Sequence, residues 1–208
     1  MNLAASGRRY VVAGSLTAVC LLAVASAPTA RAAAEPVGDE AFLDGGEMPP
    51  HPDGWYAYGP VEGLPEYPVF CFEDELPAEG ASHTSFWTEL DTNGLQVIVE
   101  TDDEDEAAEL ATALEAAAAD CAADWLRENP GSTAAWDDYG SIVAADGGHI
   151  YGVHTAPPQG GHGVRLFGVG RDGTRVTLVD WGQMGDLEDA PIGDFSTTLA
   201  AALGKLGA

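Results

Sequence analysis

The chain has 208 residues, 46% of them hydrophobic, and its 34 acidic side chains outnumber eight basic ones, for a formal net charge of −26. A surface this acidic repels phosphate backbones and anionic headgroups, which argues against nucleic acid and membrane surfaces as partners. It would attract cations or a basic protein partner, and the plainer interpretation of the same charge is an adaptation for solubility.

The first 34 residues have the features of an export signal. Arg8 and Arg9 precede an apolar run over residues 11–25, and small residues then offer cleavage after Ala32 or Ala34. The run is short for a membrane span. We therefore expect a cleaved signal peptide and a secreted protein without stable membrane insertion. A retained N-terminal anchor is the alternative.

Two details of this segment bear on the export route. The arginine pair fits either an ordinary basic region or a twin-arginine signal. Cys20 could suggest lipoprotein processing, but Val19 stands where a small residue is expected and the apolar run continues past it. We expect Cys20 to be removed with the signal.

The exported part, residues 35–208, holds all 34 acids and five of the bases, so its formal charge is 5 − 34 = −29. Residues 35–66 are rich in proline, glycine and acids, which predicts an extended arm before a domain over residues 67–208. Trp55, Tyr56, Tyr58 and Tyr67 argue that part of this segment packs on that domain, because disordered segments are aromatic-poor. An aromatic platform for sugars is the alternative.

Residues 83–100 predict a β-hairpin. Asn93-Gly94 is the preferred pair for a type I′ turn. In that register Leu90 faces Val97. The expected core face then holds Phe86, Thr88, Leu90, Leu95, Val97 and Val99.

A helix is predicted directly after the hairpin, up to residue 128. Thr101 with Glu104 forms a capping box, and the acids of residues 102–106 suit the positive end of the helix dipole. A calcium loop is disfavoured because the run has neither glycine nor EF-hand spacing. The apolar stripe of this helix is Leu110, Leu114, Ala117 or Ala118, Cys121 and Trp125.

Cys71 and Cys121 remain after cleavage of the signal. An even count in an oxidising compartment predicts a disulfide between them. Cys121 lies on the apolar stripe of the helix, so it would point inward, where Cys71 could meet it. A metal site would need further ligands at nearby spacing.

Four more strands are predicted over residues 139–144, 149–154, 163–170 and 174–182, in two hairpins joined by Asp-Gly linkers. Apolar residues on both faces of the last pair suit central strands that are covered on both sides. A final helix follows from residue 193. The fold class is therefore α+β: an antiparallel sheet of about six strands with two main helices packed on it, in the order β-β-α-β-β-β-β-α.

The most unusual charged residue is Arg165, within an otherwise apolar strand. A two-residue Asp172-Gly173 turn places it directly opposite Asp180. The plainer interpretation is a cross-strand ion pair, and the functional one is an anion-binding residue near Trp181. A three-residue loop would shift the register by one and break the pairing.

Chemical motifs are otherwise absent from the sequence. We find no nucleophile elbow or phosphate-binding loop and expect no catalytic residue, metal or cofactor. His149 and His154 would point to opposite faces of one strand, which argues against a shared metal. We interpret His149, His154 and His162 as surface or edge residues, with a weak metal site as the alternative, and His51 and His83 stand alone in the sequence. A carboxylate pair, as in glycosidases, is the rival enzymatic hypothesis.

The C-terminal two thirds, roughly residues 67–207, resemble a known family. The segments of this chain that carry the resemblance are "AAELATALEAAAADC", "SIVAADGGHIYGV", "VGRDGTRVTLVDWGQMG" and "DAPIGDF". In this order they resemble the extracellular sensor domain of actinobacterial serine/threonine kinases, the PknH-like extracellular domain, and its stand-alone secreted relatives. The resemblance implies an α+β fold with a cleft for an unidentified extracellular ligand and no catalysis.

The chain departs from this family in two ways. The family typically has two disulfides, whereas the two cysteines of the exported chain can form only one, and the sequence shows no kinase domain beside the sensor-like part. We therefore expect a secreted, non-enzymatic module that binds a small-molecule or cell-envelope ligand. An acidic interaction module for a basic protein partner is the alternative.

Overall fold

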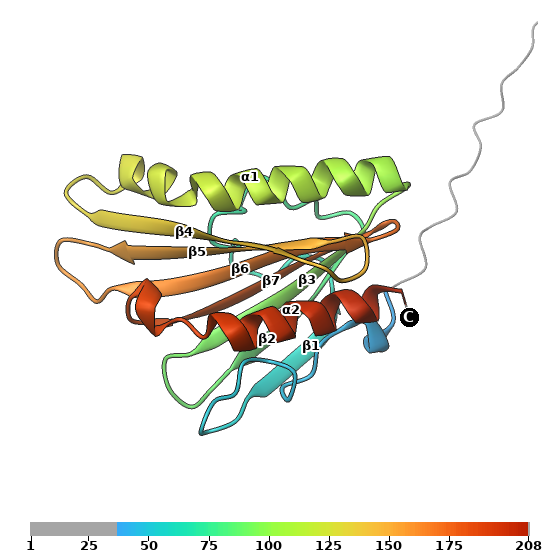
Figure 1. The fold of residues 1–208 in the computed structure, drawn as a ribbon, viewed down its shortest axis with the longest axis horizontal. Coiled ribbons are helices and arrows are strands. Elements are labelled where there is room, and N and C mark those ends of the chain that lie inside the picture. Colours follow the sequence, from blue (N-terminus) through green and yellow to red (C-terminus); the bar gives the residue numbers. More distant parts are fainter. Residues whose placement is uncertain (1–36, 208) are drawn as a thin grey trace, which may run out of the picture. The chain divides into compact units, whose positions relative to one another are not determined.

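The computed structural model describes residues 37–207, so the predicted export signal and Cys20 lie outside the described residues. The fold is α+β, with one antiparallel sheet in the strand order β1-β2-β3-β7-β6-β5-β4 (Figure 1). The seven strands are β1 (Tyr56–Glu62), β2 (Ala81–Trp87), β3 (Asn93–Glu100), β4 (Thr133–Ile142), β5 (Gly148–Ala156), β6 (Gly163–Asp172) and β7 (Arg175–Met184).

Two long helices, α1 (Glu104–Glu128) and α2 (Ile192–Leu206), pack on the sheet together with two short 3-10 helices, η1 (Asp39–Ala41) and η2 (Leu187–Asp189). The predicted class and antiparallel pairing are confirmed. The sheet has seven strands rather than about six, because β1 comes from the arm.

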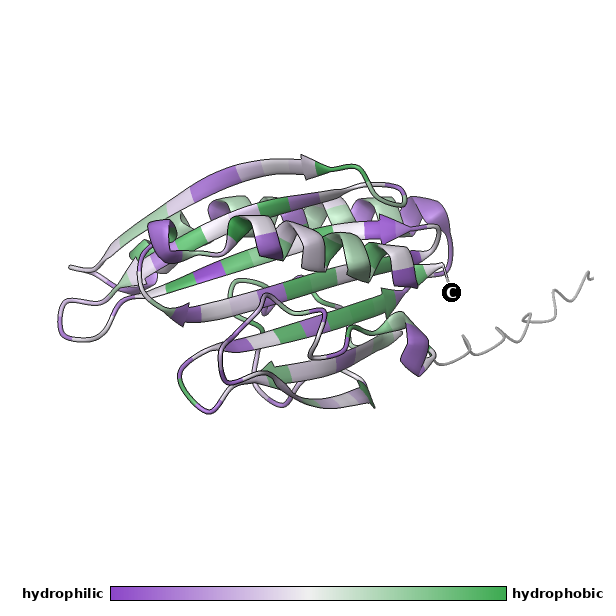
Figure 2. Cartoon of the chain, turned by 60° about the horizontal axis from the view of Figure 1, so that its bottom comes forward, coloured by the Kyte–Doolittle hydropathy of each residue, from purple (hydrophilic) through white to green (hydrophobic). Residues whose placement is uncertain are grey.

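The helices cover opposite faces of the sheet. Along β3, Val97 and Val99 pack with α1, whereas Ile98 packs with α2. The central strands therefore bury both faces, as the apolar runs in β6 and β7 predict. Hydrophobic residues accordingly fill much of β3, β6 and β7 beneath α2 (Figure 2).

The arm contributes core residues as well as β1. Val37, Phe42 and Met48 are buried in the cluster on the α2 face. The backbone of Leu43 donates a hydrogen bond to Gln96 Oε1 at 2.7 Å. Trp55 packs against the same cluster, whereas the aromatic side chain of Tyr58 is 67% exposed. The arm therefore packs on the domain, chiefly through aliphatic residues and one phenylalanine.

The predicted turn of the first hairpin is wrong. Asn93 and Gly94 lie inside β3, opposite Trp87 and Phe86, and the loop is closed by the Thr88 N–H, which donates to the Thr92 carbonyl at 3.0 Å. The observed pairing of β2 with β3 is shifted from the predicted one by an odd number of residues. The β2 side chains that were expected on the same face as Val97 therefore lie on the opposite face of the sheet. Phe86 therefore packs on the α2 face, away from Val97, and Leu90 is exposed.

The helix after this hairpin begins two residues later than the predicted capping box. Asp103 is the N-cap, and its side chain accepts a hydrogen bond from the Glu106 N–H at 2.9 Å. Glu106 in turn accepts from the Asp102 N–H at 2.9 Å. Thr101 instead donates its hydroxyl proton to the Thr174 carbonyl at 2.8 Å. The acids thus start the helix, as predicted, although a different pair forms the cap.

The apolar face of α1 differs at its ends from the predicted stripe. Leu114, Ala118 and Cys121 are buried as predicted, whereas Leu110 and Trp125 are only partly buried. Small residues fill the remaining buried positions, namely Ala107, Ala111 and Ala122. Alanines on this face let α1 lie close to the sheet.

The second predicted register is wrong by two residues. Arg165 pairs with Gly182 and Phe167 with Asp180, because the turn is formed by Gly173 and Thr174. A shift of two residues preserves the faces. Arg165 and Asp180 therefore still lie on the same face of the sheet, as diagonal rather than directly opposite neighbours.

Candidate functional site

A cavity of about 380 Å³ lies at one end of the sheet on the α1 face, and among residues 37–207 Arg165 is its only cationic lining residue. It is bounded by the start of β3, the ends of β5 and β7, and the start of β6. Its polar lining comes from Asp91, Asn93, Thr155, Arg165 and Gln183, and its apolar lining includes Phe70, Val153 and Met184. This volume is within the range of small-ligand sites.

The charge at this cavity is set by Arg165 and Asp180. Arg165 Nη1 donates to Asp180 Oδ2, as the ion-pair prediction requires. The Asp180 side chain is buried, with 7% exposed, whereas that of Arg165 is 30% exposed. Burial raises the pKa of Asp180, and the Arg165 guanidinium opposes that rise. Arg165 therefore joins a buried carboxylate to a solvent-accessible cavity.

This ion pair leaves hydrogen-bonding capacity unused. Asp180 Oδ1 is buried and has no hydrogen-bond partner among the described residues. A guanidinium carries five N–H donors, of which Asp180 takes one here. Arg165 can thus hold Asp180 and still present donors to a ligand in the cavity.

Phe70 and the disulfide fix one wall of the cavity. The Arg165 guanidinium carbon lies 5.5 Å from the centre of the Phe70 ring, a cation–π contact. The neighbouring residue Cys71 is at disulfide distance from Cys121 on α1, with the two Cα atoms 5.4 Å apart. Cys71 has φ +70°, a left-handed conformation that is uncommon outside glycine. The disulfide thus ties this wall to the long helix.

Trp181 does not belong to this site. It pairs with Leu166 and is buried among the residues on the α2 face, whereas Arg165 and Asp180 face α1. Neighbouring residues of a strand point to opposite faces. Arg165 therefore lines a cavity to which Trp181 does not contribute, and anion binding by Arg165 stays a prediction.

A second cavity, of about 360 Å³, lies between α1 and the other end of β5. His149 there contacts Ser141 Oγ through Nδ1 at 3.2 Å and Asp138 Oδ1 through Nε2 at 2.6 Å. Serine hydrolases use a similar chain, but with Nε2 toward the serine and a buried aspartate. The Asp138 side chain is 48% exposed, so we do not assign a nucleophile here. Glu115 also lines this cavity.

The histidines are arranged differently from the sequence-based interpretation. His149 and His154 do point to opposite faces of β5, as predicted. His154 and His162, however, lie together with Asp186, a residue that no sequence pattern singled out. His162 and Asp186 are 24 positions apart, just before β6 and just after β7, so only the strand pairing brings them together.

Comparisons with known proteins do not extend this description: no protein-family model and no curated protein sequence matches the chain. Within residues 37–207, no helix combines the length and the hydrophobicity that a membrane span requires.

Proposed function

We propose that this protein is a secreted, non-enzymatic ligand-binding domain that takes a small carboxylate-bearing molecule in the cavity at Arg165. The observation that carries the proposal is the position of Arg165, whose partly exposed guanidinium lines the cavity while Asp180 holds it from behind. A planar guanidinium suits a carboxylate because it can donate two parallel hydrogen bonds.

The other lining groups narrow the ligand class. Asn93 and Gln183 offer amide donors and acceptors, and Asp91 offers an acceptor for a ligand hydroxyl or ammonium. Phe70 and Met184 supply apolar surface. A compact molecule that carries both a carboxylate and a donor group, such as an amino acid or a short cell-envelope peptide, matches this lining. The resemblance to kinase extracellular sensor domains supports the same class of function, and the disulfide is compatible with an extracellular location.

The test is calorimetric titration of the purified protein with small carboxylates, amino acids and short cell-envelope peptides. The key variant is the double substitution Arg165→Gln/Asp180→Asn, which removes the guanidinium without leaving Asp180 charged and unpaired. We expect the affinity of a bound carboxylate to fall roughly 10- to 100-fold, because hydrogen bonds to charged groups contribute about 1.5–3 kcal/mol.

The second cavity provides a matched control. Arg171 lines it and pairs with Asp146 at 2.9 Å, so Arg171→Gln/Asp146→Asn removes an arginine of similar exposure, 28%, with its more exposed partner acid and leaves the Arg165 cavity untouched. This control should bind as the unsubstituted protein does. Equal affinity in the key variant, or no carboxylate binding by the folded protein, would overturn the proposal.

A further inference from the structure

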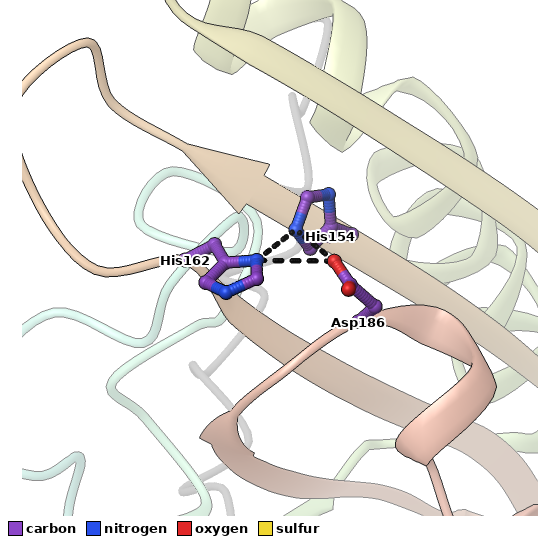
Figure 3. A group of neighbouring side chains, drawn as sticks. All are labelled: His154, His162 and Asp186. Atoms are coloured by element: carbon purple, nitrogen blue, oxygen red, sulfur yellow. Dashed lines mark hydrogen bonds and ion pairs between the residues drawn. The ribbon is translucent and has the colours of Figure 1, made fainter.

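Three metal-ligating side chains converge on the α2 face, apart from the Arg165 cavity. His154 Nε2 lies 2.9 Å from Asp186 Oδ1, and His162 Nδ1 lies 3.1 Å from the same oxygen (Figure 3). The two histidine nitrogens are 3.4 Å apart. Each atom of this triangle offers a lone pair when the aspartate is ionised and each neutral histidine carries its proton on the other ring nitrogen, His154 on Nδ1 and His162 on Nε2.

The spacing of the triangle matches one face of a metal coordination shell. An ion with ligand distances of about 2.0–2.1 Å holds its ligand atoms about 3.3 Å apart in tetrahedral geometry and about 2.9 Å apart in octahedral geometry. The three observed separations, 2.9, 3.1 and 3.4 Å, span these two values. An ion can therefore contact all three atoms without a large movement of any side chain.

Hydrogen bonding alone satisfies this arrangement less well. If both histidines donate to Asp186 Oδ1, two N–H groups are held 3.4 Å apart and aimed at a single oxygen. If either histidine lacks the proton on the nitrogen that faces Asp186, the contact between that nitrogen and Asp186 Oδ1 brings two hydrogen-bond acceptors together. A divalent cation at the centre of the triangle interacts favourably with all three lone pairs.

The backbone holds the three ligands in place. His154 lies on β5 opposite Val164. His162 directly precedes the first residue of β6, and Asp186 follows shortly after the last residue of β7. The Gly185 N–H donates to the His162 carbonyl at 3.2 Å, which joins the two turns. Asp186 is held in turn by its own N–H, which donates to Asp189 Oδ2 at 2.9 Å. Ligands built on adjacent strands and short turns are preorganised for binding.

We propose that His154, His162 and Asp186 bind a divalent transition-metal ion of the zinc class. Two imidazoles with one carboxylate suit zinc, nickel or copper, whereas calcium and magnesium prefer oxygen ligands. Three protein ligands leave a coordination position open, and the side chains of His162 and Asp186 are 50% and 57% exposed, so water or a ligand atom can reach it. The acidic chain concentrates cations around the site.

The experiment is calorimetric titration of the chelator-treated, purified protein with zinc chloride, followed by cobalt chloride with visible spectroscopy. We expect one zinc ion per chain and a cobalt spectrum typical of nitrogen and oxygen ligands, with no displacement by excess calcium. Asp186→Asn keeps the shape of the side chain and should lower the zinc affinity at least tenfold, as should His154→Ala.

The matched control is His149→Ala, which removes a histidine from the same strand that also contacts an aspartate but, among the described residues, belongs to no group of three ligand atoms. It should leave zinc binding unchanged. Circular dichroism and thermal unfolding establish that each variant is folded. A second variant, Gly185→Ala, leaves all ligands in place but strains a backbone with φ +139° and forces its Cβ within 2.8 Å of Asp189 Oδ2. It should also weaken binding.

Several outcomes would overturn the proposal. They are no zinc binding at concentrations far above that of the protein, an equal loss in His149→Ala, or ready displacement by calcium. The Arg165 double variant should bind zinc normally, so failure of the carboxylate site and failure of the metal site are distinguishable.

Discussion

Glu115 on α1 faces a cavity that it shares with His149 and Arg171. Partial burial raises the pKa of this carboxyl above its ordinary value of 4.5, His149 lowers it, and Asp138 raises it further. A raised pKa in the folded state means that the protonated form is favoured on folding. The contribution of Glu115 to stability is therefore fully present below its ordinary pKa and is lost as the pH rises through the raised value.

We predict that Glu115→Gln stabilises the protein at neutral pH, by less than about 1 kcal/mol because the group is partly solvated. The difference from the unsubstituted protein should shrink as the pH falls towards 4.5. Urea unfolding at a series of pH values measures this difference. A stabilisation that stays constant across the series would show that amide packing, rather than titration, is its cause. Glu109→Gln, also on α1 but exposed, is the control.

A contact between two residues could be predicted from the sequence where both side chains lie on the same face of neighbouring strands. The Arg165–Asp180 pair forms although its register is wrong, because a shift of two residues keeps both side chains on one face. The triangle of His154, His162 and Asp186 could not be predicted. Two of its members follow or precede strands, and their meeting depends on where those strands end, which is the least certain feature of a sequence-based prediction.

At the scale of elements, the disulfide joins the wall of the Arg165 cavity to α1. It closes a loop of 50 residues between Cys71 and Cys121. The chain-entropy model gives about 4 kcal/mol for a loop of this length. We expect Cys71→Ala/Cys121→Ala to lower the free energy of unfolding by this order, as measured by urea unfolding.

Because Phe70 precedes Cys71, the same double variant should also weaken ligand binding at the Arg165 cavity. Zinc binding should be unaffected, since its three ligands lie on the other face of the sheet. A loss of stability below about 1 kcal/mol would show that the α1 packing alone holds this segment.

The first hairpin shows why a strong local signal can fail. Asn93-Gly94 is a preferred turn pair, yet Gly94 lies within β3, where a Cβ would come within 2.5 Å of Met48 Cε. The glycine is required by the arm, which packs on this strand from much earlier in the sequence. Local turn preference carries no information about such a contact, so the tertiary packing overrides it.

At the scale of the whole molecule, the class, the antiparallel pairing and the two helices could be predicted because periodicity and caps are local. The position of the arm on the sheet could not be predicted, since residues 37–55 have no periodicity and β1 is exposed along most of its length. β1 joins the sheet at its edge by backbone hydrogen bonding to β2, and those bonds depend little on side-chain pattern.

The charge of the whole molecule sets its response to salt. The described residues include five lysines and arginines, and each pairs with an acid: Arg127–Asp124, Arg165–Asp180, Arg171–Asp146, Arg175–Glu100 and Lys205–Glu47. With a net charge of −26, repulsion among the remaining acids opposes the compact state. Added salt screens that repulsion over about 10 Å at 0.1 M and about 3 Å at 1 M, and it also weakens the exposed pairs.

Repulsion should dominate this balance, because the acids greatly outnumber the pairs and exposed pairs contribute at most about 1 kcal/mol each. We therefore predict that sodium chloride raises Tm between 0.05 and 0.5 M by on the order of 5 °C, equivalent to about 1–2 kcal/mol for a domain of this size. Thermal unfolding with chelator present measures the screening alone. Magnesium chloride at equal ionic strength is the control, since pure screening gives similar shifts for both salts. A Tm that falls with salt would mean that the five ion pairs contribute more to stability than the repulsion removes.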